Sequence, residues 1–150
     1  AKYSLVIDSL VNDFISGEIE HAIVSADQIE KPQVIVIEGQ GSLMNPAYPG
    51  GYEILAAGRP DLVVLQHAPQ RLEYDGFPGY PLHPLSHQIS AIEVVSGKKV
   101  TAITLNHEGM SPEEVEEACQ RIEREVGVPA FDVLLHGASA LTALIQARLR

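Results

Sequence analysis

Short apolar runs alternate along the chain with longer stretches of helical periodicity, and each run ends at a polar or ionisable residue. Such runs, rich in β-branched residues, are typical of strands buried on both faces of a parallel sheet. Because ligands of open α/β sheets bind outside the carboxyl ends of the strands, the residues that follow the runs are the first candidates for a site. The pattern predicts five strands, at residues 3–7, 34–37, 62–65, 100–105 and 131–135.

The stretches between these runs predict helices, at residues 9–25, 52–57, 89–95, 111–126 and 141–149. The clearest is the fourth, in which Ser111 is an N-cap, Pro112 occupies the first turn, Glu114 completes a capping box and Gly127 ends the helix. Gly58, with a proline two residues later, is expected to end the helix at 52–57. Strand and helix alternate throughout, so we expect an α/β fold of three layers, a mostly parallel sheet with helices on both faces.

Composition narrows the class of protein. A chain of 150 residues with 45% hydrophobic content can form one domain with a core, so we expect residues 1–150 to be a single α/β domain. A net charge of -10 without a basic stripe argues against nucleic acid as a partner. No apolar run has the length of a membrane span. Cys119, the single cysteine, fits a cytoplasmic location and is expected to pack rather than react.

Asp8 and Glu38 follow the first two predicted strands and form the strongest candidate pair. Neighbouring strands lie about 4.8 Å apart, so two such carboxylates can share a divalent cation, and Mg²⁺ prefers one or two carboxylates with waters and phosphates. Gly39 and Gly41 let the backbone turn and approach a ligand closely. The alternative is a pair of solvated strand ends.

Two further candidates follow later strands. Asn106 has the donor and acceptor needed to bind the edge of a ring, and the alternative is an Asx turn leading toward Ser111. His67 is a candidate general base, although a histidine after a strand is commonly a structural, hydrogen-bonded residue. His83 and His87 are four residues apart, but Pro84 lies between them in a loop, which argues against a zinc site.

The loops between Glu38 and Pro84 contain five of the eight aromatic residues, and long irregular loops are commonly functional. We expect the segment 67–87 to cover the ends of the strands and to be more mobile than the helices. The alternative is that the aromatic side chains fix the loop to the sheet. These residues are Tyr48, Tyr52, Tyr74, Phe77 and Tyr80.

Three common functional motifs are absent from the 150 residues. There is no phosphate-binding G-x-x-x-x-G-K-[ST] loop, no G-x-S-x-G nucleophile elbow and no G-x-G-x-x-G dinucleotide fingerprint.

One segment has a specific resemblance. Ile37-Glu38-Gly39-Gln40-Gly41-Ser42-Leu43, followed by Asn45-Pro46-Ala47-Tyr48, resembles the signature of a P-loop family once listed as a domain of unknown function and now described as D-glutamate N-acetyltransferase-like. The similarity extends over nearly the whole chain. It includes Asp8 with Asp13-Phe14 and Gly17, Pro60-Asp61, His67, Tyr80-Pro81 and Leu105-Asn106.

The resemblance implies a nucleotide-binding fold similar to that of dethiobiotin synthetase. It implies that Glu38 helps to hold Mg²⁺ and that Asn106 contacts a purine. With the candidates selected from the strand ends, we expect Asp8 and Glu38 to be the metal ligands, and Glu38 and His67 to serve catalysis. Gly39, Gly41 and Ser42 would bind the cofactor, either ATP or acetyl-CoA. The implied activity is that of a transferase, with acyl transfer to the amine of a small anionic amino-acid substrate.

The family's phosphate-binding loop lies upstream, on a strand and helix that this sequence does not contain. The resemblance therefore identifies the chain as the C-terminal part of a longer protein, whose missing N-terminal region is an expected partner, with a homo-oligomer as another possibility. Three hypotheses follow: an enzyme domain, a ligand-binding or regulatory module without turnover, and a fragment that is inactive without its N-terminal half.

We predict that the isolated chain binds ATP weakly or undetectably, because it lacks the backbone amide cradle that binds phosphates. We also expect it to self-associate, since strand edges and apolar faces left uncovered favour association. Titration calorimetry with magnesium-ATP and sedimentation of the chain test both expectations. Micromolar binding to a monomer would contradict them.

Overall fold

A computed structural model describes residues 2–39, 41–47 and 50–149. It divides into two compact units, Ala1–Pro60 and Asp61–Arg150, which are considered in turn. Gln40 and Tyr48, both part of the predicted signature, lie outside the described residues. The assignment of the whole chain to a single domain stays a prediction. None of the helices in the described ranges is both long and apolar enough to span a membrane.

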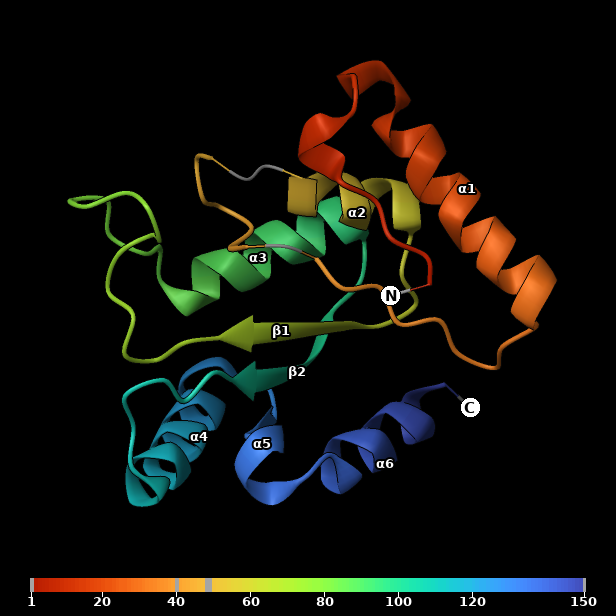
Figure 1. Ribbon diagram of the computed structural model, residues 1–150. Coiled ribbons are helices and arrows are strands. Elements are labelled where there is room, and N and C mark those ends of the chain that lie inside the picture. The colour runs from red at the N-terminus through yellow and green to blue at the C-terminus, as the bar shows by residue number, and fades with distance from the viewer. Residues whose placement is uncertain (1, 40, 48–49, 150) are drawn as a thin grey trace. The chain divides into compact units, whose positions relative to one another are not determined.

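The first unit is helical. It contains a short 3-10 helix, η1 (Ile7–Ser9), followed by α1 (Asn12–Glu30) and α2 (Gly50–Gly58) (Figure 1). Ile15 and Ile19 of α1 are buried, whereas Phe14 of the same helix is 66% exposed. A methyl group at Gly58 would lie 3.5 to 4.0 Å from side chains of α1 and of Ile37, at ordinary van der Waals contact, so α2 packs against both there.

Two predicted strands of this unit are wrong. Residues 3–7 and 34–37 are not strands, and in the described part of the chain no other strand pairs with them. Val36 is 88% exposed, whereas the sequence predicted a run buried on both faces. The reason is that a β-branched run becomes a strand only when a neighbour supplies its backbone hydrogen bonds. Asp8 consequently lies in η1, and Glu38 lies in a segment that is neither helix nor strand.

Helix boundaries in the first unit also differ from the prediction. Helix α1 continues to Glu30 and ends where Lys31 takes a left-handed conformation at φ 46°. The proline that follows Lys31 disfavours further helix. After α2, the residue with positive φ is Arg59, at 44°, and Gly58 is still helical. The expected glycine stop at Gly58 is therefore wrong by one residue.

The second unit contains a three-stranded parallel sheet of β1 (Val63–His67), β2 (Val100–Leu105) and β3 (Ala130–Phe131), in the order β1-β2-β3. The expected α/β class, with a mostly parallel sheet flanked by helices, is confirmed. Helix α3 connects the first two strands and α4 the next two (Figure 1). The helices are α3 (Leu85–Ser96), α4 (Pro112–Val126), α5 (Val133–His136) and α6 (Ser139–Arg148).

Both connections from helix to strand use the same arrangement. Gly97 and Gly127 end α3 and α4 in left-handed conformations, at φ 68° and 69°. Four residues before each glycine, a glutamate accepts a hydrogen bond from the first N–H of the next strand. These bonds join Val100 N to Glu93 Oε1 at 3.2 Å and Ala130 N to Glu123 Oε1 at 2.9 Å. Each glutamate thereby satisfies a backbone donor at the start of a strand.

The core of the second unit is centred on β2. Ala102, Ile103 and Leu105 are almost completely buried, as are Val115 and Ala118 of α4. Cys119 is also buried in this helix, which confirms that it packs. Its pKa is raised, first by burial and then by nearby carboxylates, so the thiol is a poor nucleophile at neutral pH.

The predicted strand at 131–135 is wrong after its first residue. The Asp132 side chain accepts hydrogen bonds from Leu134 N and Leu135 N, at 3.0 and 2.8 Å, and this N-cap starts α5 at Val133. Because Asp favours N-cap positions, its local hydrogen bonds outweigh the β preference of the apolar residues around it.

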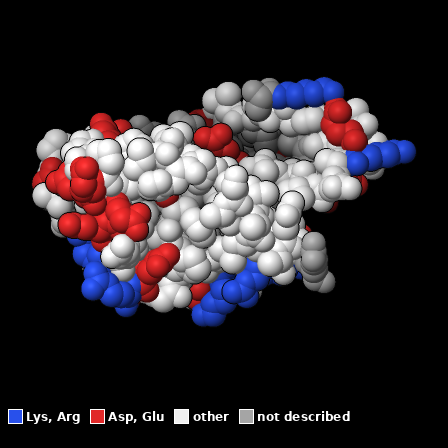
Figure 2. Space-filling view, turned by 90° about the horizontal axis from the view of Figure 1, so that it is seen from below, with Lys and Arg blue, Asp and Glu red and all other residues white. Residues whose placement is uncertain are grey.

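Helix α4 has the predicted capping box. Ser111 Oγ accepts from Glu114 N at 3.3 Å, and Glu114 Oε2 accepts from Ser111 N at 2.7 Å. Glutamates in the first turn also favour the positive end of the helix dipole. In the view of Figure 2, from below, acidic side chains gather at the left end of the surface, on the side where α4 lies in Figure 1. Lys and Arg side chains form small separate groups.

We predict that Ser111→Ala lowers the free energy of unfolding by about 1 kcal/mol, because it removes the acceptor for an otherwise unpaired N–H of α4. Urea unfolding followed by circular dichroism measures the change. Ser86→Ala, at an exposed serine in the first turn of α3, is the matched control and should cost less than half as much. Equal effects of the two substitutions would contradict the capping role.

Candidate functional site

The carboxyl ends of β1 and β2 meet at one edge of the sheet. His67 is opposite Leu105 in the parallel register, and Asn106 N donates to the His67 carbonyl at 2.8 Å. The structure therefore brings together two of the residues selected from the sequence, His67 and Asn106. Their proposed roles as base and purine contact stay predictions.

The His67 ring is partly buried, and its environment favours the neutral form. Burial is the largest cause that lowers the pKa of this imidazole below its usual value near 6.5; Glu125 raises the pKa, and Arg121 lowers it further. A neutral imidazole can accept a proton or a hydrogen bond, so the chemistry expected of His67 is available to it.

Asn106 forms the local turn that the sequence offered as the alternative to ligand binding. Its Oδ1 accepts from Glu108 N at 3.2 Å. This Asx-type bond occupies the acceptor oxygen and directs the chain away from β2 toward α4. A purine contact through Asn106 would have to use the amide N–H groups or a second lone pair of the oxygen.

A pair that was not among the selected residues lies at the same edge. His107, two residues after β2, is hydrogen-bonded through Nδ1 to Oδ2 of Asp132, directly after β3. The Asp132 side chain is completely buried, and the His107 side chain is 34% exposed. The pair thus joins the ends of two neighbouring strands and extends from the interior to the surface.

The surroundings of Asp132 favour its ionised form in spite of its burial. Burial is the largest influence and raises the pKa, but hydrogen bonds from Leu135 N, His107 and Leu134 N, together with the positive charge of His107 when it is protonated, outweigh it, so the pKa lies below the usual value of 3.8. A carboxylate can only accept, so His107 Nδ1 carries the proton of the shared bond. The lone pair of the neutral ring is then on Nε2. Among the described residues, no hydrogen bond to Nε2 is present.

The sequence contains a signal for the position of Asp132, but the predicted strand at 131–135 is incompatible with it. Assigning 131–135 to one strand placed Asp132 inside that strand rather than at its end. An aspartate before four helix-compatible residues is also a candidate N-cap, and that assignment would have placed Asp132 at the end of a strand.

The segment after β1 forms an ordered loop. Tyr74 N donates to the Tyr80 carbonyl at 3.0 Å, and Leu82 N donates to the Leu72 carbonyl at 2.8 Å. Tyr74 is buried and bonds His83 Nδ1 through its hydroxyl at 2.7 Å. These contacts join one part of the loop to another, and the alternative in which the aromatic side chains fix the loop to the sheet stays a prediction. The greater mobility of the loop stays a prediction as well.

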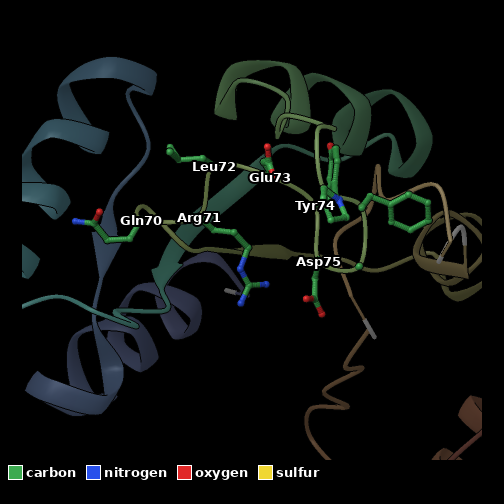
Figure 3. A pocket seen from close by; sticks show the side chains of 9 residues that line it. Gln70, Arg71, Leu72, Glu73, Tyr74 and Asp75 are labelled. Atoms are coloured by element: carbon green, nitrogen blue, oxygen red, sulfur yellow. The ribbon is translucent and has the colours of Figure 1, made fainter.

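An arginine of this loop reaches the site edge. Arg71 Nη2 lies 3.1 Å from Oε2 of Glu108, the residue after His107. Residues 70–78 also line an open hollow of about 520 Å³, where Arg71 and Asp75 extend to the same side of the loop in the view of Figure 3. A guanidinium is thus available near the carboxyl ends of the strands.

The remaining selected residues lie in the first unit. Asp8 and Glu38 are both exposed, as are Gly39 and Gly41, and Gly41 has φ 71°. Ser42 begins a turn in which its carbonyl accepts from Asn45 N at 2.9 Å. In the described part of the chain, no three His, Cys, Asp or Glu side chains gather as metal ligands. Mg²⁺ binding by Asp8 and Glu38, and their clustering with His67 and Asn106, stay predictions.

Comparison with known proteins assigns the family. The family model described as "Domain of unknown function (DUF1611_C) P-loop domain" matches residues 1–142, and the chain belongs to this family. The expected resemblance is thereby confirmed. A crystal structure of a DUF1611 family protein from Anabaena variabilis superposes with a TM-score of 0.85 at 27% identity, over 95% of this chain and 43% of that one.

Two curated relatives have a named activity. Proteins called D-glutamate N-acetyltransferase, from Tritonibacter scottomollicae and a Pseudoalteromonas species, are 29% and 32% identical to the chain. The matches cover 94% and 93% of this chain but only 43% of each relative. The chain therefore spans less than half the length of the curated relatives that it matches.

We predict that His67 makes the protein less stable as the pH falls through about 6.5. Since the folded state lowers the His67 pKa, the unfolded chain binds the proton more readily, and acidification favours unfolding. His67→Gln should flatten the fall in unfolding free energy between pH 7.5 and 5.5, measured in urea. His21→Gln, at an exposed position of α1, should leave it unchanged. An equal slope in wild type and His67→Gln would contradict this prediction.

Proposed function

We propose that the chain is part of an enzyme that transfers an acetyl group to the amine of an acidic amino acid, with D-glutamate as the first candidate substrate. The observation that carries this proposal is the similarity, over more than nine-tenths of the chain, to two proteins named for that activity. The second unit adds side chains suited to such a reaction at the carboxyl edge of its sheet.

The chemistry of amine acetylation sets two requirements. An amino acid's ammonium group must lose a proton before it can attack a carbonyl carbon, which calls for a base. The side-chain carboxylate of an acidic substrate calls for a cation, and arginine binds carboxylates through paired hydrogen bonds. His67 and His107 are candidate bases at the edge of the sheet, and Arg71 is a candidate cation beside Glu108.

A nucleotide and Mg²⁺ belong to the same proposal. The family description as a P-loop domain supports a nucleotide-binding origin of the fold. Asp8 and Glu38 would be the Mg²⁺ ligands, Gly39, Gly41 and Ser42 would approach the cofactor, and Asn106 would contact its base. The acetyl donor would be a thioester such as acetyl-CoA, which supplies a good leaving group.

We predict that the intact gene product containing this sequence acetylates D-glutamate with acetyl-CoA. Thiol release and mass spectrometry of N-acetylglutamate measure the reaction, with L-glutamate and D-alanine as tests of configuration and of the acidic side chain. The 150-residue chain by itself is the parallel sample, because it spans 43% of the curated relatives.

Turnover of D-glutamate above that of D-alanine would support the proposal. Absence of N-acetylglutamate with the intact product, under conditions where a curated relative is active, would contradict it. Binding of D-glutamate without product would instead support the ligand-binding or regulatory module.

A further inference from the structure

We propose that His107 is the general base that deprotonates the substrate amine and that Asp132 positions it. The inference rests on the proposed function and deepens it, because it chooses between the two histidines at the edge of the sheet. It is carried by the hydrogen-bonded pair that joins the ends of β2 and β3.

The Asp132 carboxylate is fixed by its surroundings. Its Oδ1 accepts from the N–H groups of Leu134 and Leu135, and its Oδ2 faces His107 Nδ1. With the side chain completely buried, water does not compete for these bonds. A carboxylate held in this way fixes both the orientation and the tautomer of its histidine, as a positioning residue does in acid–base sites.

The His107 ring is placed to use that fixed tautomer. Its backbone is held on the α4 side by the bond from Met110 N to the His107 carbonyl, at 3.0 Å. The side chain is one-third exposed, so a substrate can reach the ring. Because Nδ1 faces Asp132, the basic nitrogen is Nε2. The partial exposure of the ring and the lone pair on Nε2 therefore both fit the role of a base.

The paired histidine is better suited to this role than His67. No hydrogen bond joins the His67 ring to a carboxylate within the described ranges, and burial is the main influence on that ring. Glu125 favours an imidazolium at His67 through its charge but without a hydrogen bond, and Arg121 and burial oppose it. An imidazolium formed at His107 would face Asp132 directly.

The proton balance of the step is complete. His107 Nε2 takes one proton from the substrate ammonium, and the neutral amine attacks the thioester carbonyl to form the N–C bond. The C–S bond breaks as the tetrahedral intermediate collapses. The second amine proton goes to the leaving thiolate, so the products are the amide, the thiol and protonated His107, which returns its proton to solvent.

The test is steady-state kinetics of the intact gene product with D-glutamate and acetyl-CoA. We expect His107→Gln to lower kcat about 10²- to 10⁴-fold while the KM for D-glutamate changes little, since the base acts on the reaction rather than on binding. Asp132→Asn, which keeps the size of the side chain, should lower kcat with the same pattern. His87→Gln, at an exposed position of α3, should retain wild-type kinetics.

Chemical rescue separates a base from a structural residue. His107→Ala should regain part of its kcat with added imidazole, because the native ring is partly exposed and its space can be reached from solvent. Wild-type melting behaviour of the variants confirms that they are folded, and rescue by itself requires a folded enzyme.

The outcomes are distinguishable. A wild-type product without acetyltransferase activity overturns the proposed function and this role with it. An active wild type with an equally active His107→Gln overturns only the assignment of His107. Loss of kcat in His67→Gln with rescue by imidazole, and no loss in His107→Gln, would assign the base to His67.

Discussion

The buried carboxylate of Asp132 is the group on which the site edge depends. Asp132 follows β3 directly and is the N-cap of α5. Its Oδ1 accepts from Leu134 N and Leu135 N, and its Oδ2 is hydrogen-bonded to His107 Nδ1. An isolated buried carboxylate would be costly, but this one receives three hydrogen bonds, and these compensate for the loss of water. The same three bonds fix the direction in which His107 presents its remaining nitrogen. The same contacts therefore determine both the start of α5 and the orientation of the candidate base.

How much the sequence predicted depends on how local the stabilising contacts are. Helix α4 was predicted with its cap and its end because Ser111, Glu114 and Gly127 act within the helix itself. Strands β1 and β2 were predicted because their apolar runs pair with each other in the core. Residues 34–37 have an equally β-branched sequence, yet they form no strand, because strand formation depends on a distant partner that the run itself does not encode.

The candidate site shows the same division. His67 and Asn106 were predicted to lie together because parallel strands end at a common edge, and the register of β1 with β2 brings their backbones together. His107 and Asp132 were missed because their pairing joins residues 25 positions apart across two strands. Periodicity identifies the strands, but not which polar residues near their ends will form a pair. The candidate reaction comes from neither the sequence pattern nor the geometry of the site. It comes from the similarity to relatives named D-glutamate N-acetyltransferase.

The role of His107 as a base requires that ionised Asp132 hold the proton of the ring on Nδ1 and leave Nε2 free. Long-range ¹H–¹⁵N correlation spectra of the imidazole nitrogens test it most directly, with His107→Gln used to assign the resonances. We predict that the neutral His107 ring is the Nδ1–H tautomer in the wild type and that Asp132→Asn shifts the proton toward Nε2. A wild-type spectrum with the proton on Nε2, or one that Asp132→Asn leaves unchanged, would contradict the account.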